Sequence, residues 1–263
     1  MSFDFSTASS LANSLSYFCG RGEDYERYRP IHPSAAIDTI LSGLNPPIVA
    51  ADIGAGTGIG SRLLANRGVQ VFAIEPNAEM RSSATPHERV EFLAGTGEQI
   101  PLETSSVDLV TSFQAFHWFK FAKSLKEFRR ILKPGGRLAL IWSLWDQNDA
   151  ASRAYTQLIS EASKAQEQSH SKPWLESLQY QLFWRGFWLP DFKEFQQRSF
   201  SFTQELDLTG LVGLARSQGF TPSEGEAFEK LVLDLSKFCD RYCDAQGQVR
   251  LAYRTRLYLA TSP

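Results

Sequence analysis

The sequence has few of the residues that hold metal ions or disulfide networks. It contains 3 cysteines and 4 histidines in 263 residues, and no histidine or cysteine pair at zinc-site spacing lies near Cys239 and Cys243 to complete a metal site. Cys239 and Cys243 are four residues apart in an expected helix, and we expect both to be reduced packing residues. No metal is therefore expected. His32, His87 and His170 lack neighbours that indicate a site, so we expect each in a solvated position.

The chain also lacks a strong charge and a long apolar run. Its formal net charge of −2 argues against a general attraction to nucleic acid or to an anionic membrane. It has no basic start followed by an apolar segment, and no stretch reaches the roughly 20 apolar residues that cross a bilayer. We therefore expect a cytoplasmic protein without nucleic-acid or membrane partners, as a monomer or weak homodimer.

Strand and helix patterns alternate as far as Trp145, which is typical of a parallel sheet covered on both faces. With 43% hydrophobic residues, residues 1–263 can form one large α/β domain. The apolar runs that predict buried strands are Ile48–Ile53, Val69–Ile74, Val90–Ala94, Val107–Ser112 and Arg137–Trp145. Helices are expected at Ser61–Asn66, Asn77–Ser83 and Phe121–Leu132, the last ending in the turn Lys133-Pro134-Gly135-Gly136.

The pattern changes after Trp145. Residues 146–190 are first helical and polar and then rich in aromatic side chains, so we expect an inserted helical segment there. The remaining expected elements are a half-exposed strand at Phe192–Phe202, helices at 203–217 and 222–243, and a final strand at Val249–Ala260. Together these elements predict seven strands.

A glycine-rich turn, Asp52-Ile53-Gly54-Ala55-Gly56-Thr57-Gly58, joins the first expected strand to the next helix. Glycine lets a main chain adopt unusual angles and approach a ligand, and the N–H groups of a helix start favour acceptor atoms. Dehydrogenases use a related turn, but they need glycine at its first, third and sixth positions. The sixth position is Ile59 when counted from Gly54 and Ser61 when counted from Gly56, so neither register fits.

The turn resembles the acidic-x-Gly-x-Gly-x-Gly motif of class I S-adenosylmethionine-dependent methyltransferases, with Asp52 at the acidic position. The resemblance implies an α/β, Rossmann-like, seven-stranded and mostly parallel sheet with helices on both faces and a helical lid insertion. It also implies S-adenosylmethionine as the cofactor, with its amino-acid half held by the turn. Glu75, at the end of the second strand, either accepts both ribose hydroxyls or is a solvated strand-end charge.

A second similar segment is Gly95–Pro101. In the family, the second residue of this loop usually contacts adenine and is acidic, whereas here it is Thr96. Glu98 either contacts the ligand or braces the loop. With these segments, the resemblance implies that the cofactor contacts are Asp52, Gly54, Ala55, Gly56, Thr57, Gly58, Glu75, Pro76, Met80, Thr96, Gly97, Glu98 and Gln114.

Further segments are similar to small-molecule methyltransferases of the type-11 group, including trans-aconitate methyltransferase-like proteins. These segments are Tyr25–Pro30, Gln114–Phe119, Leu132–Leu138 and Tyr253–Tyr258. The resemblance implies a small-molecule acceptor that attacks the methyl group in line through an O, N or C atom. We expect residues 1–45 to hold a lid and the first helix, and residues 146–190 either to select the acceptor or to pack onto the domain. Expected acceptor contacts are Tyr25, Arg29, His117, Trp118 and Trp184.

His117 is the first candidate for a catalytic base, because it follows the fourth strand on the ligand-binding edge of the sheet and titrates near neutrality. The alternative is a packed histidine between Phe116 and Trp118. Tyr28 is the second candidate, if the N-terminal segment covers the cofactor rather than lying on the surface. Rival functions are a cofactor-binding protein without turnover, an NAD(P)-dependent oxidoreductase, and a methyltransferase of RNA or protein.

Overall fold

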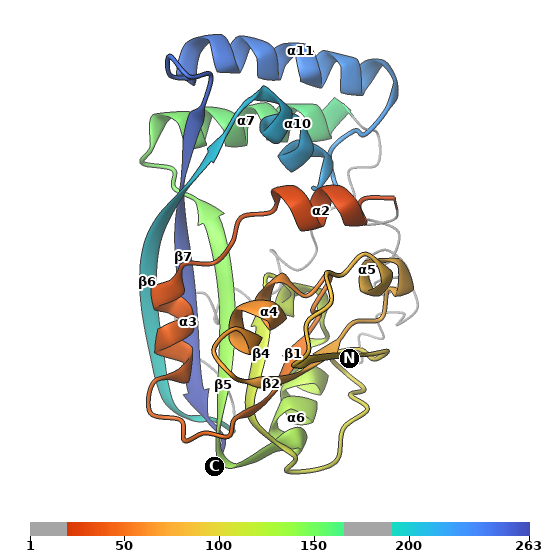
Figure 1. Cartoon of the computed structure of the whole chain (residues 1–263), viewed down its shortest axis with the longest axis vertical. Coiled ribbons are helices and arrows are strands. Elements are labelled where there is room, and N and C mark those ends of the chain that lie inside the picture. Colours follow the sequence, from red (N-terminus) through yellow and green to blue (C-terminus); the bar gives the residue numbers. More distant parts are fainter. Residues whose placement is uncertain (1–19, 166–190) are drawn as a thin grey trace, which may run out of the picture.

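A computed structural model describes residues 20–165 and 191–263 of the chain (Figure 1). Seven strands form one sheet in the order β3-β2-β1-β4-β5-β7-β6. Neighbours among β1 to β5 are parallel, whereas β7 is antiparallel to β5 and to β6. The predicted Rossmann-like, mostly parallel sheet is therefore confirmed. The strands are β1 Val49–Ile53, β2 Gln70–Ile74, β3 Val90–Leu93, β4 Val107–Phe113, β5 Leu132–Trp145, β6 Lys193–Leu206 and β7 Val249–Thr261.

Helices cover both faces of the parallel part of the sheet. On one face, α3 (Ser34–Leu41) and α4 (Ile59–Ala65) bury Ile37, Ile40 and Leu64 against the strands. On the other face, α6 (Phe121–Ile131) packs Leu125 and Phe128 into a second core. The short helix α5 (Ala78–Ser82) follows β2, and its first N–H groups donate to the side chain of Asn77, as the sequence predicts.

Strands β5, β6 and β7 extend beyond the parallel part of the sheet, toward a group of helices at the top of Figure 1. These helices are α7 (Ala150–Ala165), α10 (Leu208–Arg216) and α11 (Gly225–Tyr242), and with the ends of β5, β6 and β7 they share a third core. We call this group the cap. Helix α2 (Gly22–Tyr28) lies between the cap and the parallel part of the sheet. No helix in the described ranges is long and apolar enough to cross a membrane.

Two predicted boundaries are wrong. The helix expected at 203–217 begins only at Leu208, because β6 continues to Leu206 and pairs there with Val249 of β7. Asp207 then caps α10 by accepting a hydrogen bond from Gly210 N at 2.7 Å. The turn expected before β5 lies within that strand as a register shift against β4, with Gly135 at φ +74. α7 confirms a polar helix after Trp145, while residues 166–190, with Trp184 and His170, lie outside the described residues.

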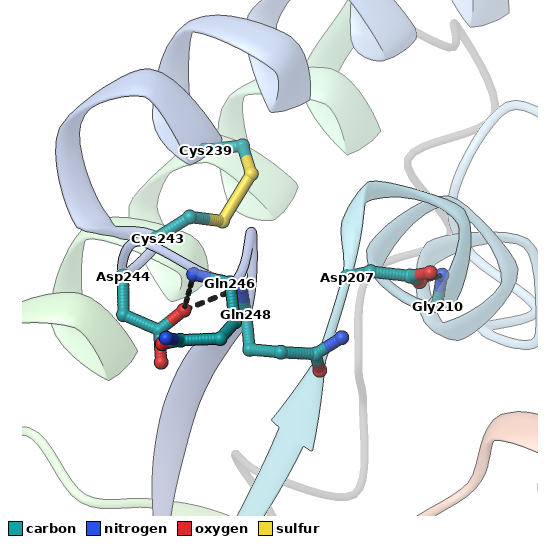
Figure 2. The surroundings of a disulfide bond; sticks show 7 residues. All are labelled: Asp207, Gly210, Cys239, Cys243, Asp244, Gln246 and Gln248. Atoms are coloured by element: carbon teal, nitrogen blue, oxygen red, sulfur yellow. Dashed lines mark hydrogen bonds between the residues drawn. A yellow bond between two sulfur atoms is a disulfide. The ribbon is translucent and has the colours of Figure 1, made fainter.

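The prediction of reduced cysteines is also wrong, because Cys239 and Cys243 form a disulfide (Figure 2). Cys239 lies in the last turn of α11 and Cys243 follows the helix, so the i, i+4 spacing brings the two sulfur atoms together. The chain then turns into β7, and Asp244 accepts hydrogen bonds from Gln246 N and Gln248 N (Figure 2). The disulfide therefore joins the end of α11 to the turn that starts β7.

Replacing both cysteines by serine should lower the free energy of unfolding by about 2 kcal/mol, the loop-closure entropy of so short a loop. Chemical denaturation with and without a thiol reductant measures this loss. The reductant should destabilise the wild-type protein by the same amount and leave the C239S/C243S variant unchanged. Equal stability of the oxidised protein and the variant would show that the disulfide does not stabilise the cap.

Candidate functional site

The carboxyl ends of β1, β2 and β4 meet around one cavity beneath α2. Several residues predicted from the sequence line it, namely Tyr25, Gly54, Gly56, Glu75, Pro76, Met80, Gln114 and Trp118. The lining also includes four residues that the sequence did not single out, namely Asn77, Phe113, Ala115 and Phe119. A cavity at this edge is the usual ligand position in open α/β sheets.

The glycine-rich turn needs glycine for both conformation and space. Gly54, Gly56 and Gly58 have φ angles of +71°, +60° and +80°, which side chains rarely adopt. A Cβ atom on Gly54 would lie 2.6 Å from the Cβ atom of Ala115. A Cβ atom on Gly56 would lie 3.3 Å from the Met80 methyl group, inside the cavity. The missing side chain at Gly56 therefore leaves the main chain open to the cavity, whereas the space at Gly54 is filled by Ala115 and Phe119.

Glu75 joins this turn to the end of β2. Its Oε2 atom accepts a hydrogen bond from Gly56 N at 2.9 Å, and its Oε1 atom accepts one from Asn77 N at 2.9 Å. Burial raises the pKa of Glu75, although these N–H groups oppose the shift. The carboxylate is thus a buried group on the cavity wall rather than a solvated charge. Each oxygen keeps a second lone pair for a ligand hydroxyl.

Asp52 does not line the cavity but supports the glycine-rich turn from within the fold. Its Oδ2 atom accepts from Ser61 Oγ at 2.6 Å, and its Oδ1 atom accepts from Thr111 Oγ1 at 2.9 Å. These bonds connect β1 to α4 and β4. Burial raises the pKa of Asp52 to about 6, and the two hydroxyl donors oppose the shift.

The loop at Gly95–Pro101 packs beside the cavity without belonging to its lining. Thr96 and Gln99 exchange two main-chain hydrogen bonds that close the loop. Glu98 Oε1 accepts from Lys120 N at 2.6 Å, so its carboxylate braces the start of α6. A Cβ atom on Gly97 would lie 2.7 Å from the ring of Phe119.

Phe119 is a residue that sequence reasoning missed, although it belongs to the Gln114–Phe119 segment. Its ring lies within 2.9 Å of the Cβ position of Gly54 and reaches Gly97 in the loop after β3. The missing side chains at these two glycines therefore make room for one aromatic ring. The sequence gives no signal of this contact, because the spacing of Gly54, Gly97 and Phe119 does not show that they meet in the fold.

The residues predicted on α2 point in different directions. Tyr25 lines the cavity, and burial raises the pKa of its phenol. The ring of Tyr28 instead packs against Gly213 of α10, where a Cβ atom would lie 2.2 Å from it. The guanidinium of Arg29 lies 4.7 Å from the centre of the Tyr25 ring and donates a hydrogen bond to Ser217 O at 3.0 Å.

The remaining predicted residues lie around the end of β4. Both ends of the Gln114 amide bond the main chain of Ser143, with N···O distances of 2.8 and 3.0 Å. His117, in the short 3₁₀ helix η1 (Phe116–Trp118), accepts a hydrogen bond from Trp142 Nε1 on its Nδ1 atom at 3.2 Å. The neutral ring then carries its proton on Nε2. Its role as a base stays a prediction.

The expectation that His32 is solvated is wrong. Its side chain is 6% exposed, and its Nδ1 atom lies 2.9 Å from Ser143 Oγ, which in turn lies 2.8 Å from Thr255 Oγ1. Burial lowers the pKa of His32 to about 4, so the ring is neutral at physiological pH. The partners come from β5 and β7, more than a hundred residues away, so local sequence could not reveal them.

Comparison with known proteins bears on this cavity. Residues 51–140, which contain the turn, Glu75 and the end of β4, match the family model of the methyltransferase domain. An uncharacterised methyltransferase of Mycobacterium tuberculosis is 41% identical over 144 residues, which are 54% of this chain and 57% of that protein. One from Schizosaccharomyces pombe is 36% identical over 129 residues, 48% of this chain and 51% of that protein. The chain thus spans little more than half the length of these curated relatives.

The match to a methyltransferase domain is confined to residues 51–140. Solved structures agree on the fold. An assigned type II methyltransferase of Anaeromyxobacter dehalogenans aligns with a TM-score of 0.61 at 19% identity, over 89% of this chain and 97% of that one. The phosphoethanolamine N-methyltransferase 2 of Haemonchus contortus aligns with a TM-score of 0.54 at 18% identity, over 99% of this chain and 61% of that one. Apart from Tyr25, the described residues that line the cavity lie within the matched residues 51–140.

The raised pKa of Asp52 predicts a pH-dependent stability. The folded protein resists ionisation of this carboxyl, so its contribution is fully present below the unfolded pKa of 3.8 and is lost as the pH rises toward about 6. Relative to the D52N variant, the wild-type free energy of unfolding should fall by about 2 kcal/mol between pH 4 and pH 7. Denaturation curves across this range measure the difference, and a difference that stays constant with pH would contradict the assignment.

The second prediction for the site concerns Glu75. E75Q keeps the shape but loses the charge, so the dissociation constant of S-adenosylhomocysteine should rise by roughly 10- to 100-fold. Calorimetric titration measures it. D108N is the matched control, because Asp108 also accepts a main-chain N–H, from Val49 at 3.0 Å, but lies at the opposite end of β4. Equal losses in the two variants would mean that Glu75 acts only on the fold.

Proposed function

We propose that the chain transfers the methyl group of S-adenosylmethionine to a small-molecule acceptor. The observation that carries this proposal is the single cavity in which the open turn at Gly54–Gly58, the buried carboxylate of Glu75 and the ring of Tyr25 meet. When bound, the cofactor supplies a methyl group on a positively charged sulfur, which an acceptor atom displaces in line.

The residues at the cavity fit such a cofactor. Gly56 leaves a space that a Cβ atom would reduce, and the Thr57 hydroxyl is buried without a hydrogen-bond partner in the described structure. Glu75 is on the wall and Asp52 lies behind it, so the surroundings favour positive charge. Thr57 supplies an unused hydroxyl, and Glu75 supplies acceptors for ribose.

The chain's own contribution to catalysis is then alignment and exclusion of water. The rings of Tyr25, Trp118 and Phe119 close the cavity, and Gln114 is held in place by Ser143. Holding two reactants in line and away from water can supply much of a rate enhancement for an intrinsically reactive group. Among the described residues, His117 remains the proposed base for an acceptor that must lose a proton, and to accept that proton its Nδ1 atom would have to give up the hydrogen bond from Trp142.

Arg29 supports an acceptor that carries a negative charge. Its Nε atom is buried and has no hydrogen-bond partner, and it forms no ion pair within the described parts of the chain. A buried N–H group without an acceptor costs about 1–3 kcal/mol. A carboxylate of the acceptor would satisfy this group. Trp118, which lines the cavity, is proposed to contact the acceptor, whereas Tyr28, the second proposed base, packs against Gly213 of α10.

Other features of the protein remain part of this proposal. We infer a single domain over residues 1–263, with residues 1–45 forming the lid and 146–190, including Trp184, influencing acceptor choice. The protein is proposed to act in the cytoplasm, as a monomer or weak homodimer, without nucleic-acid or membrane partners.

Transfer of a tritiated methyl group from S-adenosylmethionine into a metabolite extract tests the proposal, with identification of the labelled product. A labelled small anion is the expected result. Binding of S-adenosylhomocysteine without any label transfer would favour a cofactor-binding protein without turnover. Failure to bind it by calorimetry would overturn the proposal.

R29Q should lower kcat/KM for the labelled acceptor by roughly 10- to 100-fold, because it removes a charge-assisted hydrogen bond to an anion. The affinity for S-adenosylhomocysteine should stay within about twofold of the wild type. R21Q is the matched control, since Arg21 also binds main-chain oxygens near the end of α10, at Arg216, Gln218 and Thr221. A similar loss in R21Q would assign the effect to the placement of α2.

A further inference from the structure

Helix α2 is attached to two different parts of the molecule. On the cap side, Arg21 donates to main-chain oxygens after α10, the ring of Tyr28 packs against Gly213, and Asp24 pairs with Arg216 at 3.2 Å. The opposite side faces α4, α5 and the glycine-rich turn. The single residue that makes the ionic contact on that side is Glu26, among the residues that the structure describes.

Glu26 reaches the cofactor turn through Arg62. Its Oε1 atom pairs with Arg62 Nη2 and also accepts from Thr85 Oγ1 at 2.9 Å. Arg62 in turn donates from Nη1 to Thr57 O at 2.7 Å, within the glycine-rich turn. The side chains of Arg62 and Glu26 are 17% and 21% exposed, so solvent screens the pair only in part. Two side chains therefore link α2 to the turn that surrounds the cofactor.

The second carboxylate oxygen of Glu26 differs from the first. Oε2 is buried and has no hydrogen-bond partner in the described structure. A buried acceptor without a donor is unfavourable, so this oxygen has an unused capacity to accept a hydrogen bond. Tyr25, which lines the cofactor cavity, directly precedes Glu26 on the same helix. A shift of the helix backbone at Glu26 would therefore also move Tyr25, which lines the cavity.

We propose that Glu26 is a positioning residue for the cofactor. Its ion pair with Arg62 fixes the separation between α2 and the glycine-rich turn. This separation in turn determines how far Tyr25 lies from the bound cofactor. The cap-side contacts of α2 hold the same helix but do not touch the turn. This inference rests on the proposed function, because it assumes that the cavity binds S-adenosylmethionine.

E26Q and D24N form a matched pair of variants that separates the two sides of α2. Each loses one carboxylate of the same helix, and each side chain is 21% exposed in the folded protein. Calorimetric titration with S-adenosylhomocysteine should show a dissociation constant raised about tenfold in E26Q and within about twofold of the wild type in D24N. Hydrogen exchange of residues 20–29 in the complex should be faster in E26Q than in D24N.

Thermal unfolding of both variants checks that a lower affinity does not reflect a lost fold. If E26Q does not fold because Arg62 is left unpaired, the E26Q/R62Q double variant removes both charges and should show the same tenfold loss. Equal affinities in E26Q and D24N, or a wild-type affinity in E26Q, would overturn the inference while leaving the proposed function intact. A wild-type protein that does not bind S-adenosylhomocysteine would instead overturn the proposed function and this inference with it.

Discussion

The hydrogen bond from Gly56 N to Glu75 Oε2 joins the ends of β1 and β2, and the geometry of the cofactor site depends on it. Gly54 N and Ala55 N both donate to Ile74 O, the last residue of β2 before Glu75. These three bonds hold the glycine-rich turn at the sheet edge while its backbone is left-handed. A side chain at Gly54 would meet Ala115, so the turn, β2 and the end of β4 form one packed unit. The position of the carboxylate is therefore fixed before any ligand arrives.

The two buried carboxyls of this unit, Asp52 and Glu75, have different surroundings. Asp52 accepts one hydrogen bond at each oxygen, from Ser61 and Thr111, and ties β1 to its neighbours. Glu75 also uses each oxygen once, but it lines the cavity. The acidic residue of the glycine-rich motif therefore braces the fold, while the acid at the end of the next strand faces the cavity. The raised pKa of both groups has the same cause, which is burial.

Sequence patterns predicted the features that depend on neighbouring residues. Apolar runs located the five parallel strands, and the spacing of the glycines in the turn distinguished it from a dinucleotide fingerprint. Contacts between distant segments were not predictable in the same way. His32 is buried only because β5 and β7 bring Ser143 and Thr255 to it. The strand β6 extends to Leu206 because β7 pairs with it there, although its last residues were expected to be helical.

The candidate site shows the same division. Of its cavity residues, Gly56, Glu75 and Met80 lie in segments whose roles follow from one strand and one turn. Phe119 ends the Gln114–Phe119 segment, yet its role is visible only in the fold, where its ring packs against Gly54 and Gly97. The disulfide was missed for a related reason. The spacing of Cys239 and Cys243 allows a shared helix face, but the bond needs the chain to leave the helix at Cys243.

The charges around the cavity suit two ligands of opposite sign. Burial is the main cause that raises the pKa of the Tyr25 phenol; Arg29 lowers it, and Glu75 and Asp52 raise it further. The Arg29 guanidinium lies 4.7 Å from the centre of the Tyr25 ring. In the proposed complex, the cationic sulfur belongs on the carboxyl side and an anionic acceptor belongs beside Arg29. Both ligands would then approach each other across Tyr25. Tyr25 lies in α2 and Arg29 directly follows it, and Glu26 links the helix to the turn, so in the proposed complex the placement of α2 would affect both the cofactor and the acceptor.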